Sequence, residues 1–171
     1  GYTRDNGLKN ICIMPNPMSI TPKAAKMLAD AEMDSVLIHI DTINQEVYNQ
    51  LHTNPKTLEL KIRGYRNLLE AGYPPRQVIG VVTFTKPLAP VYEEIVDWFI
   101  DEMGAGMFIP CTFRTEGFAR LEKYRDLEPS LSEYRWAFEY RAGKLGDENL
   151  LRLGSADGKA ICKNYILVKD D

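Results

Sequence analysis

The sequence predicts an α/β fold, a partial parallel (βα) barrel wall of about four βα units followed by a C-terminal extension with a helix and a short strand. Short apolar runs rich in β-branched residues alternate with segments whose apolar residues recur at helical spacing. The runs show little polar alternation, which is typical of parallel strands covered on both faces. The units recur about every thirty to forty residues, the size of a βαβ motif with its right-handed crossover.

The composition indicates a cytoplasmic protein that binds neither nucleic acid nor membranes. Its 171 residues are 44% hydrophobic, and 21 basic and 24 acidic residues give a net charge of -3 without any charge block. The apolar runs are far shorter than the roughly 20 residues that span a bilayer, and no signal-peptide segment opens the chain. Three widely spaced cysteines, Cys12, Cys111 and Cys162, are typical of reduced cytosolic thiols.

The first predicted unit begins with a strand over residues 8–14, which Pro15 and Pro17 end because proline has no backbone N–H. Thr21 then precedes Pro22, and a threonine N-cap followed by proline is typical of a helix start. The apolar face of this helix consists of Ala24, Ala25, Leu28 and Ala31.

The second unit has a strand over residues 35–40 and two helices. Asn44 is expected to cap a short helix over residues 45–51, and Asn54-Pro55 separates it from a longer helix. The apolar positions of the longer helix are Leu58, Ile62, Tyr65 and Leu69. Gly72 is expected to end it.

Two further strands are predicted, over residues 78–83 and 107–111, with a helix over residues 91–103 between them. After residue 112 the pattern changes and becomes irregular. A last helix, over residues 131–145, is expected to be capped by Ser130 or Ser132, and residues 165–168 are strand-like.

We therefore divide the chain into a partial barrel, residues 1–120, and an extension, residues 121–171, which we expect to be truncated. A sheet of four parallel strands leaves two unpaired edges, and natural proteins usually cover or close such edges. We accordingly expect neighbouring strands from a longer polypeptide, or self-association of two copies through the open edges.

Polar residues stand at the ends of successive predicted strands: Asn16 after the first, His39 and Asp41 at the second, and Thr83 at the third. The carboxyl ends of parallel strands meet at one edge of a sheet, where ligands commonly bind. His39 and Asp41 alternate along one strand, so they share a face and could cooperate as an acid-base pair.

A series of short fragments occurs in order between about residues 7 and 120. The fragments are Asn16, Ile38-His39-Ile40-Asp41, Val47-Tyr48-Asn49-Gln50-Leu51, Leu69-Glu70-Ala71-Gly72-Tyr73, Val81-Val82-Thr83, Glu93-Glu94-Ile95-Val96-Asp97-Trp98, Gly104-Ala105, Pro110 and Gly117-Phe118-Ala119. In this order they resemble the rear portion of a radical S-adenosylmethionine (radical SAM) iron-sulfur enzyme. The resemblance implies a partial barrel that holds a 4Fe-4S cluster, cleaves S-adenosylmethionine reductively and abstracts hydrogen from a substrate.

The resemblance also implies roles for five residues. Asn16 and Thr83 would meet the ribose or adenine of S-adenosylmethionine, and His39 and His52 its amino-acid carboxylate. Asp41 would accept from the ammonium group or orient His39. Many members of the family have serine and arginine where this chain has His39 and His52, so the contact would be weaker and pH-sensitive here.

The cluster-binding cysteine triplet of the family is missing from this sequence, and Pro17 replaces a common glycine after Asn16. An iron-sulfur cluster needs closely placed thiolates, so we expect this chain to be inactive by itself and to carry no cofactor alone. Cys162 and the residues after it resemble the start of the auxiliary-cluster (SPASM-like) region of peptide-modifying members. Cys162 would ligate an auxiliary cluster only in a longer protein, or it is a lone reduced thiol.

Simpler roles remain open for each residue. Asn16 and Thr83 could be turn formers, His39 a hydrogen-bonded core residue, Asp41 a cap before the next helix, and His52 an exposed helix end. Cys12 and Cys111, in apolar strands, read as small core residues.

Two other function classes also remain open. One is a non-catalytic βα-repeat binding or scaffold module, and the other is an unrelated barrel hydrolase or lyase that uses His39 and Asp41. The sequence does not identify the substrate, which could be a peptide or a small molecule.

Overall fold

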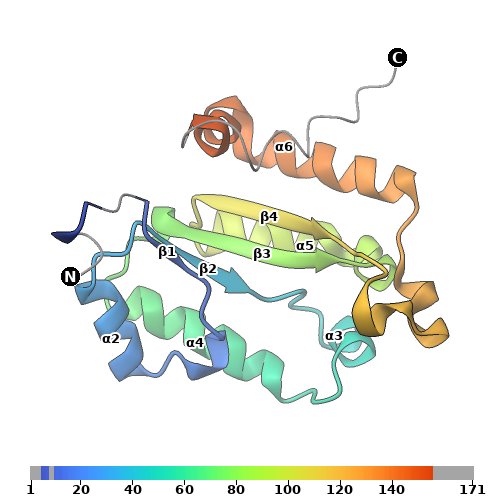
Figure 1. Cartoon of the computed structure of the whole chain (residues 1–171), viewed down its shortest axis with the longest axis horizontal. Helices are drawn as coiled ribbons and strands as arrows, with labels where there is room; N and C mark the ends of the chain where they lie inside the picture. The colour runs from blue at the N-terminus through green and yellow to red at the C-terminus, as the bar shows by residue number, and fades with distance from the viewer. Residues whose placement is uncertain (1–4, 8–9, 156–171) are drawn as a thin grey trace.

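The computed structural model describes residues 5–7 and 10–155 and shows one four-stranded sheet, in which all strands are parallel (Figure 1). The strands are β1 (Cys12–Ile13), β2 (Ser35–His39), β3 (Val78–Phe84) and β4 (Met107–Thr112). They lie in chain order, so each helical crossover adds the next strand on the same side. The predicted alternation of parallel strands and helices is confirmed.

The α-helices begin close to their predicted positions, whereas the short 3-10 helices were not predicted. The helical elements are η1 (Pro17–Ser19), α2 (Pro22–Asp30), α3 (Gln45–Leu51), α4 (Thr57–Glu70), η2 (Pro75–Gln77), η3 (Lys86–Val91), α5 (Tyr92–Asp97), η4 (Trp98–Glu102), η5 (Gly117–Arg120), η6 (Glu122–Leu127) and α6 (Leu131–Ser155). The predicted caps are confirmed at Thr21, whose hydroxyl accepts from the Ala24 N–H, and at Asn44 on α3. Of the two candidates for α6, Ser130 makes the cap, in a reciprocal pair with Glu133.

Three predicted elements differ in extent. β1 spans two residues rather than residues 8–14, of which 8 and 9 lie outside the described residues, since the chain turns away at Pro15 and Pro17. The helix predicted over residues 91–103 is present as α5, which continues as the π-helix η4 to Glu102, and the 3-10 helix η3 precedes it. α6 continues past residue 145 through a non-helical Gly146 to Ser155. The predicted strand 165–168 lies outside the described residues.

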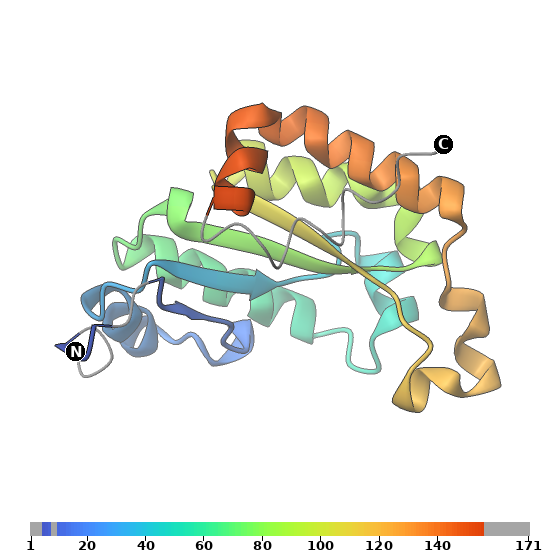
Figure 2. The same ribbon diagram turned by 45° about the horizontal axis from the view of Figure 1, so that its top comes forward.

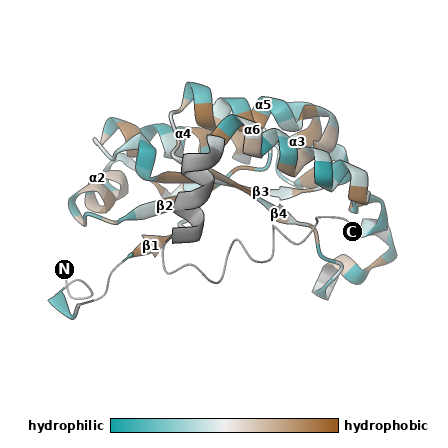
Figure 3. Ribbon diagram, turned by 90° about the horizontal axis from the view of Figure 1, so that it is seen from above, coloured by the Kyte–Doolittle hydropathy of each residue, from teal (hydrophilic) through white to brown (hydrophobic). Residues whose placement is uncertain are grey.

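The main core lies between the sheet and the helices that cover one of its faces, as Figure 3 shows for α2, α4 and α5. Val36 and Ile38 of β2 and Ile40 just after it face this core, while His39 points to the other side of the strand. Gly80 of β3 leaves room for the ring of Phe99, because a β-carbon there would lie 2.7 Å from that ring. The core thus holds β2 and β3 in a fixed register, which aligns their carboxyl ends.

The last helix, α6, lies along α5 and contacts β4 (Figure 2). Asp97 of α5 joins the two helices, because it accepts from the Tyr140 hydroxyl at 2.7 Å and pairs with Lys144 at 2.9 Å. Within residues 5–7 and 10–155, no helix has the length and apolar character needed to cross a membrane.

Candidate functional site

The site is built around the carboxylate of Asp41, which follows β2 and is only 7% exposed. Its Oδ1 atom lies 2.9 Å from Nε2 of His39, and its Oδ2 atom lies 3.0 Å from Nε2 of His52. The backbone N–H of Thr83, at the end of β3, also donates to Oδ1 at 2.9 Å. Three donors from three segments therefore converge on one buried carboxylate.

Local sequence explains how the first two groups meet. Successive side chains of a strand alternate between faces, so His39 and Asp41 project to the same side. The N–H of Ile40 donates to the Val81 carbonyl at 3.2 Å and keeps the chain extended beside β3 up to Asp41. Two residues further along β3, the N–H of Thr83 donates to the Asp41 side chain rather than to a backbone carbonyl of the neighbouring strand.

Helix α3 brings the third group back to the same carboxylate. The Asn44 side chain accepts from the N–H groups of Glu46 and Val47 at 3.1 and 3.2 Å, which starts the helix immediately after β2. The helix lasts two turns and ends at His52, whose N–H donates to the Tyr48 carbonyl. Because α3 is so short, its C-terminal residue remains within reach of Asp41.

The Asp41 carboxyl is ionised throughout the ordinary pH range. Burial by itself would raise its pKa, but the hydrogen bonds from His39 and His52 outweigh burial and hold the pKa far below its usual range. The positive charge of His39 and the Thr83 N–H act in the same direction. An ionised carboxylate can only accept hydrogen bonds, so Nε2 of each histidine carries a proton and Nδ1 remains for other partners.

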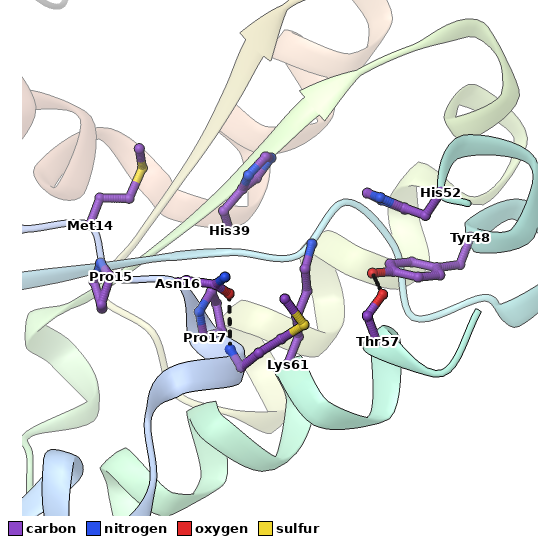
Figure 4. Close-up of a pocket in the computed structure, with 10 residues that line it drawn as sticks. Met14, Pro15, Asn16, Pro17, His39, Tyr48, His52, Thr57 and Lys61 are labelled. Atoms are coloured by element: carbon purple, nitrogen blue, oxygen red, sulfur yellow. Dashed lines mark hydrogen bonds between the residues drawn. The ribbon is translucent and has the colours of Figure 1, made fainter. Parts of the chain in front are cut away.

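A cavity of about 470 Å³ opens beside the two histidines, next to the part of β2 that extends beyond the short β1 (Figure 4). It is lined by Met14, Pro15, Asn16, Pro17, Met18, His39, Tyr48, His52, Thr57 and Lys61. Among the described residues, its ionisable lining consists of two histidines, one lysine and one tyrosine, with no acidic side chain. Asp41 lies behind the histidines and does not line the cavity, so this lining favours anions.

Tyr48 organises one wall of the cavity. It is fully buried, and its hydroxyl lies 2.8 Å from the Thr57 hydroxyl at the start of α4. The ring of His52 stacks on the Tyr48 ring with centroids 4.0 Å apart, and the Lys61 ammonium lies 5.6 Å from the same ring centroid. One aromatic ring therefore lies against both basic side chains on this wall.

The opposite wall is η1, which packs directly on α4. A β-carbon on Gly64 would overlap the carbonyl oxygen of Pro17, so only glycine allows this approach. The Asn67 side chain donates to the Ile20 carbonyl at 2.8 Å one turn further along α4. These contacts place Asn16, just before η1, across the cavity from Tyr48 (Figure 4).

The structure brings together His39, Asp41 and Thr83 at strand ends, as the sequence predicts, and His52 joins them from the end of α3. Asp41 lies 2.9 Å from His39, which is the contact that an orienting role would use. The alternative of Asp41 as a cap is wrong, because Asn44 caps α3 and the Asp41 carboxylate is taken up by other donors. His52 does end a helix, but its side chain is 28% exposed and held by Asp41.

Asn16 lies at the cavity, and its side chain also makes the turn contact that the simpler alternative describes. Its Oδ1 atom accepts from the Met18 N–H at 3.1 Å, which leaves the amide N–H groups for other partners. Thr83 does not line the cavity; its hydroxyl lies 3.4 Å from Nε2 of His39.

Three cavity residues were missed by sequence reasoning: Tyr48, Thr57 and Lys61. Tyr48 precedes His52 by four positions and Thr57 precedes Lys61 by four, so each pair shares one helix face. This spacing was the available signal, but it identifies a shared face and does not show which face lines a cavity.

The cysteines do not form a metal site in the described part of the chain. Cys12 is exposed, so its prediction as a core residue is wrong, because β1 is an edge strand. Cys111 is half-buried, and burial followed by the nearby Asp41 charge raises the pKa of its thiol. Over residues 5–7 and 10–155, no three His, Cys, Asp or Glu side chains are grouped to hold a metal ion. Cys162 lies outside the described residues.

Comparison with known proteins adds no assignment to this geometry. A scan against protein-family models found none that matches the chain, and a search of curated proteins found no match either. The chemistry of the cavity is therefore the basis on which a function can be proposed.

Proposed function

We propose that this chain is the rear wall of a radical S-adenosylmethionine barrel and that its cavity receives the amino-acid end of S-adenosylmethionine. The observation that carries this proposal is the pair of histidines, held by one buried carboxylate, that open on a cavity to which the described part of the chain contributes no acidic side chain. The parallel sheet supports it as well, because β1 and β4 are edges to which further barrel strands could be added.

In this proposal, His39 and His52 bind the carboxylate of the ligand in their doubly protonated forms, in which Nε2–H faces Asp41 and Nδ1–H donates to the ligand. Asp41 acts on both rings as a positioning residue, and its three hydrogen bonds make it a poor acceptor for the ligand ammonium. The amide of Asn16 donates to a polar edge of the ligand. Thr83 contributes through its backbone N–H to Asp41 rather than through contact with the ribose or adenine.

The cavity fits part of the cofactor set that the resemblance implies. A volume of about 470 Å³ accommodates the methionine portion of S-adenosylmethionine, and the cationic lining suits its carboxylate. The described residues do not fit a 4Fe-4S cluster, because they contain no group of three ligating side chains. Cleavage of S-adenosylmethionine would therefore require ligands from elsewhere. The sequence alone predicts that this chain carries no cofactor by itself, whereas the cavity leads us to propose that it binds added S-adenosylmethionine without turnover.

Calorimetry with S-adenosylmethionine and 5′-methylthioadenosine tests the proposal, because the second compound lacks the amino-acid group. We expect saturable binding of the first and much weaker binding of the second. His39→Ala and His52→Ala should each reduce the affinity for S-adenosylmethionine by about tenfold or more, whereas the exposed Lys56→Ala should not. Equal affinity for both compounds would contradict the proposal.

A second candidate function is an acid-base hydrolase or lyase, which the 2.9 Å contact between His39 and Asp41 favours. In the neutral ring, Nδ1 of His39 would be the base, with its orientation fixed by the carboxylate. This candidate predicts turnover by the chain alone without a reductant, which His39→Ala would abolish. The radical enzyme proposal predicts binding without turnover, so one set of assays separates the two.

A further inference from the structure

We propose that Lys61 is the permanent cation of the cavity and that the cavity binds an oxyanion even when both histidines are neutral. The identity of this oxyanion as the carboxylate of S-adenosylmethionine rests on the proposed function, whereas the anion site itself does not. Lys61 thus supplies the pH-independent charge that a pair of histidines lacks.

The position of Lys61 is defined by two packed neighbours. It lies one turn after Thr57 on the same face of α4, and its half-buried side chain rises from the helix between η1 and Tyr48. Figure 4 shows it pointing toward the space between His39 and His52. Gly64, further along α4, keeps η1 against the helix and so closes the cavity on that side.

The charges around Lys61 leave its ammonium free to meet a ligand. No ion pair involves Lys61 among the described residues, and its nearest aromatic neighbour is the Tyr48 ring at 5.6 Å. The ionisable groups facing the cavity are His39 from β2, Tyr48 and His52 from α3, and Lys61 itself; the segment from Met14 to Met18 contributes none. Asp41 is turned toward the two histidines.

The two kinds of cation respond differently to pH. A histidine side chain loses its charge between about pH 5 and pH 8, while a lysine ammonium keeps its charge well above pH 8. Binding should therefore persist at about pH 8.5 because of Lys61. A site that depends on the histidines alone would lose affinity once both rings are neutral.

The test uses inorganic phosphate and S-adenosylmethionine as separate probes, each titrated at about pH 6 and about pH 8.5. The proteins are the full chain, K61Q, K61R and the control K56Q, whose lysine is exposed beside the start of α4 and outside the cavity. Binding is followed by calorimetry and by the chemical shifts of the two histidine rings. Thermal unfolding of each variant verifies that its fold is intact.

At the higher pH, we expect K61Q to bind phosphate at least about tenfold more weakly than the full chain. At the lower pH, binding of phosphate by K61Q should still be strong enough to measure. K61R should retain most of the affinity, and K56Q should match the full chain. Equal affinity of K61Q and the full chain for either probe at about pH 8.5 would overturn the inference.

The two probes separate this inference from the proposed function. Phosphate binding that depends on Lys61, without any binding of S-adenosylmethionine, would support the anion site and contradict the proposed function. Binding of S-adenosylmethionine that K61Q leaves unchanged would support the proposed function and overturn the role of Lys61. If neither probe binds to the full chain, both proposals are wrong.

Discussion

The backbone of Pro17 lies directly against Gly64 of α4, so closely that a β-carbon on Gly64 would overlap the Pro17 carbonyl oxygen. Glycine inside a helix costs about 1 kcal/mol relative to alanine. The close contact with Pro17 explains why residue 64 is a glycine. This contact brings η1 and α4 close enough to form two walls of the cavity.

Gly64→Ala should therefore lower the free energy of unfolding by about 1–3 kcal/mol, because the methyl group forces η1 away from the helix. It should also weaken ligand binding, since Asn16 would move with η1. Gly143→Ala is the matched control: no atom lies within 4 Å of its β-carbon position on α6, so it should stabilise by up to about 1 kcal/mol. Urea denaturation measures the free energy of unfolding of both variants. An unchanged free energy of unfolding in Gly64→Ala would contradict the close packing of η1 on α4.

Asp41→Asn should lower the free energy of unfolding at neutral pH by about 2–4 kcal/mol, because the buried side chain that accepts three hydrogen bonds loses its negative charge. Asp30→Asn is the control. Asp30 belongs to an exposed pair with Lys26, which contributes less than about 1 kcal/mol. Equal effects of the two substitutions in urea titrations would argue against a structural role for the buried carboxylate.

The same carboxylate predicts how stability depends on acid. Because the folded pKa of Asp41 lies below its ordinary value, the unfolded chain takes up the proton first as the pH falls. The contribution of Asp41 is thus complete near neutral pH and declines from about pH 5 downward. In Asp41→Asn this component is absent, so the free energy of unfolding should fall less steeply between about pH 5 and pH 3. Parallel slopes for the two proteins would count against the assigned pKa direction.

Asn44→Ala should cost about 1 kcal/mol and should act locally on α3, which carries Tyr48 and His52 to the cavity. Amide hydrogen exchange should become faster in residues 46–52, and the His52 ring resonances should shift. Thr21→Ala removes the cap of α2 at a similar cost, but α2 does not line the cavity, so the His52 resonances should stay in place. Equal shifts in both variants would mean that the His52 resonances do not report on α3.

Cys111 should react with iodoacetamide more slowly than Cys12 at about pH 8, because burial and the nearby Asp41 charge raise the pKa of the Cys111 thiol. Cys12 is exposed on the edge strand. In Asp41→Asn, labelling of Cys111 should become faster under conditions where the variant is folded. Peptide mass spectrometry gives both rates, and a Cys111 rate equal to that of Cys12 would contradict this arrangement.

Local sequence is sufficient to predict the strands, the helices and several of their boundaries. Apolar runs, helical spacing and the cap residues Thr21 and Asn44 act over a few neighbouring positions, and the structure follows them. The shared face of His39 and Asp41 follows in the same way, because strand alternation is a local property. The helix predicted over residues 91–103 is present over residues 92–102, but its spacing did not show that the last turn is a π-helix.

The cavity depends on packing between segments far apart in the chain. Asn16 lies across the cavity from Tyr48 because Gly64 lets η1 pack on α4, and Cys12 is exposed because β1 lies at the edge of the sheet. Periodicity in the sequence identifies which residues share a face, but the partner of that face is chosen by the total fit of side chains in three dimensions. The elements therefore follow from local chemistry, whereas the composition of the site follows from tertiary contacts.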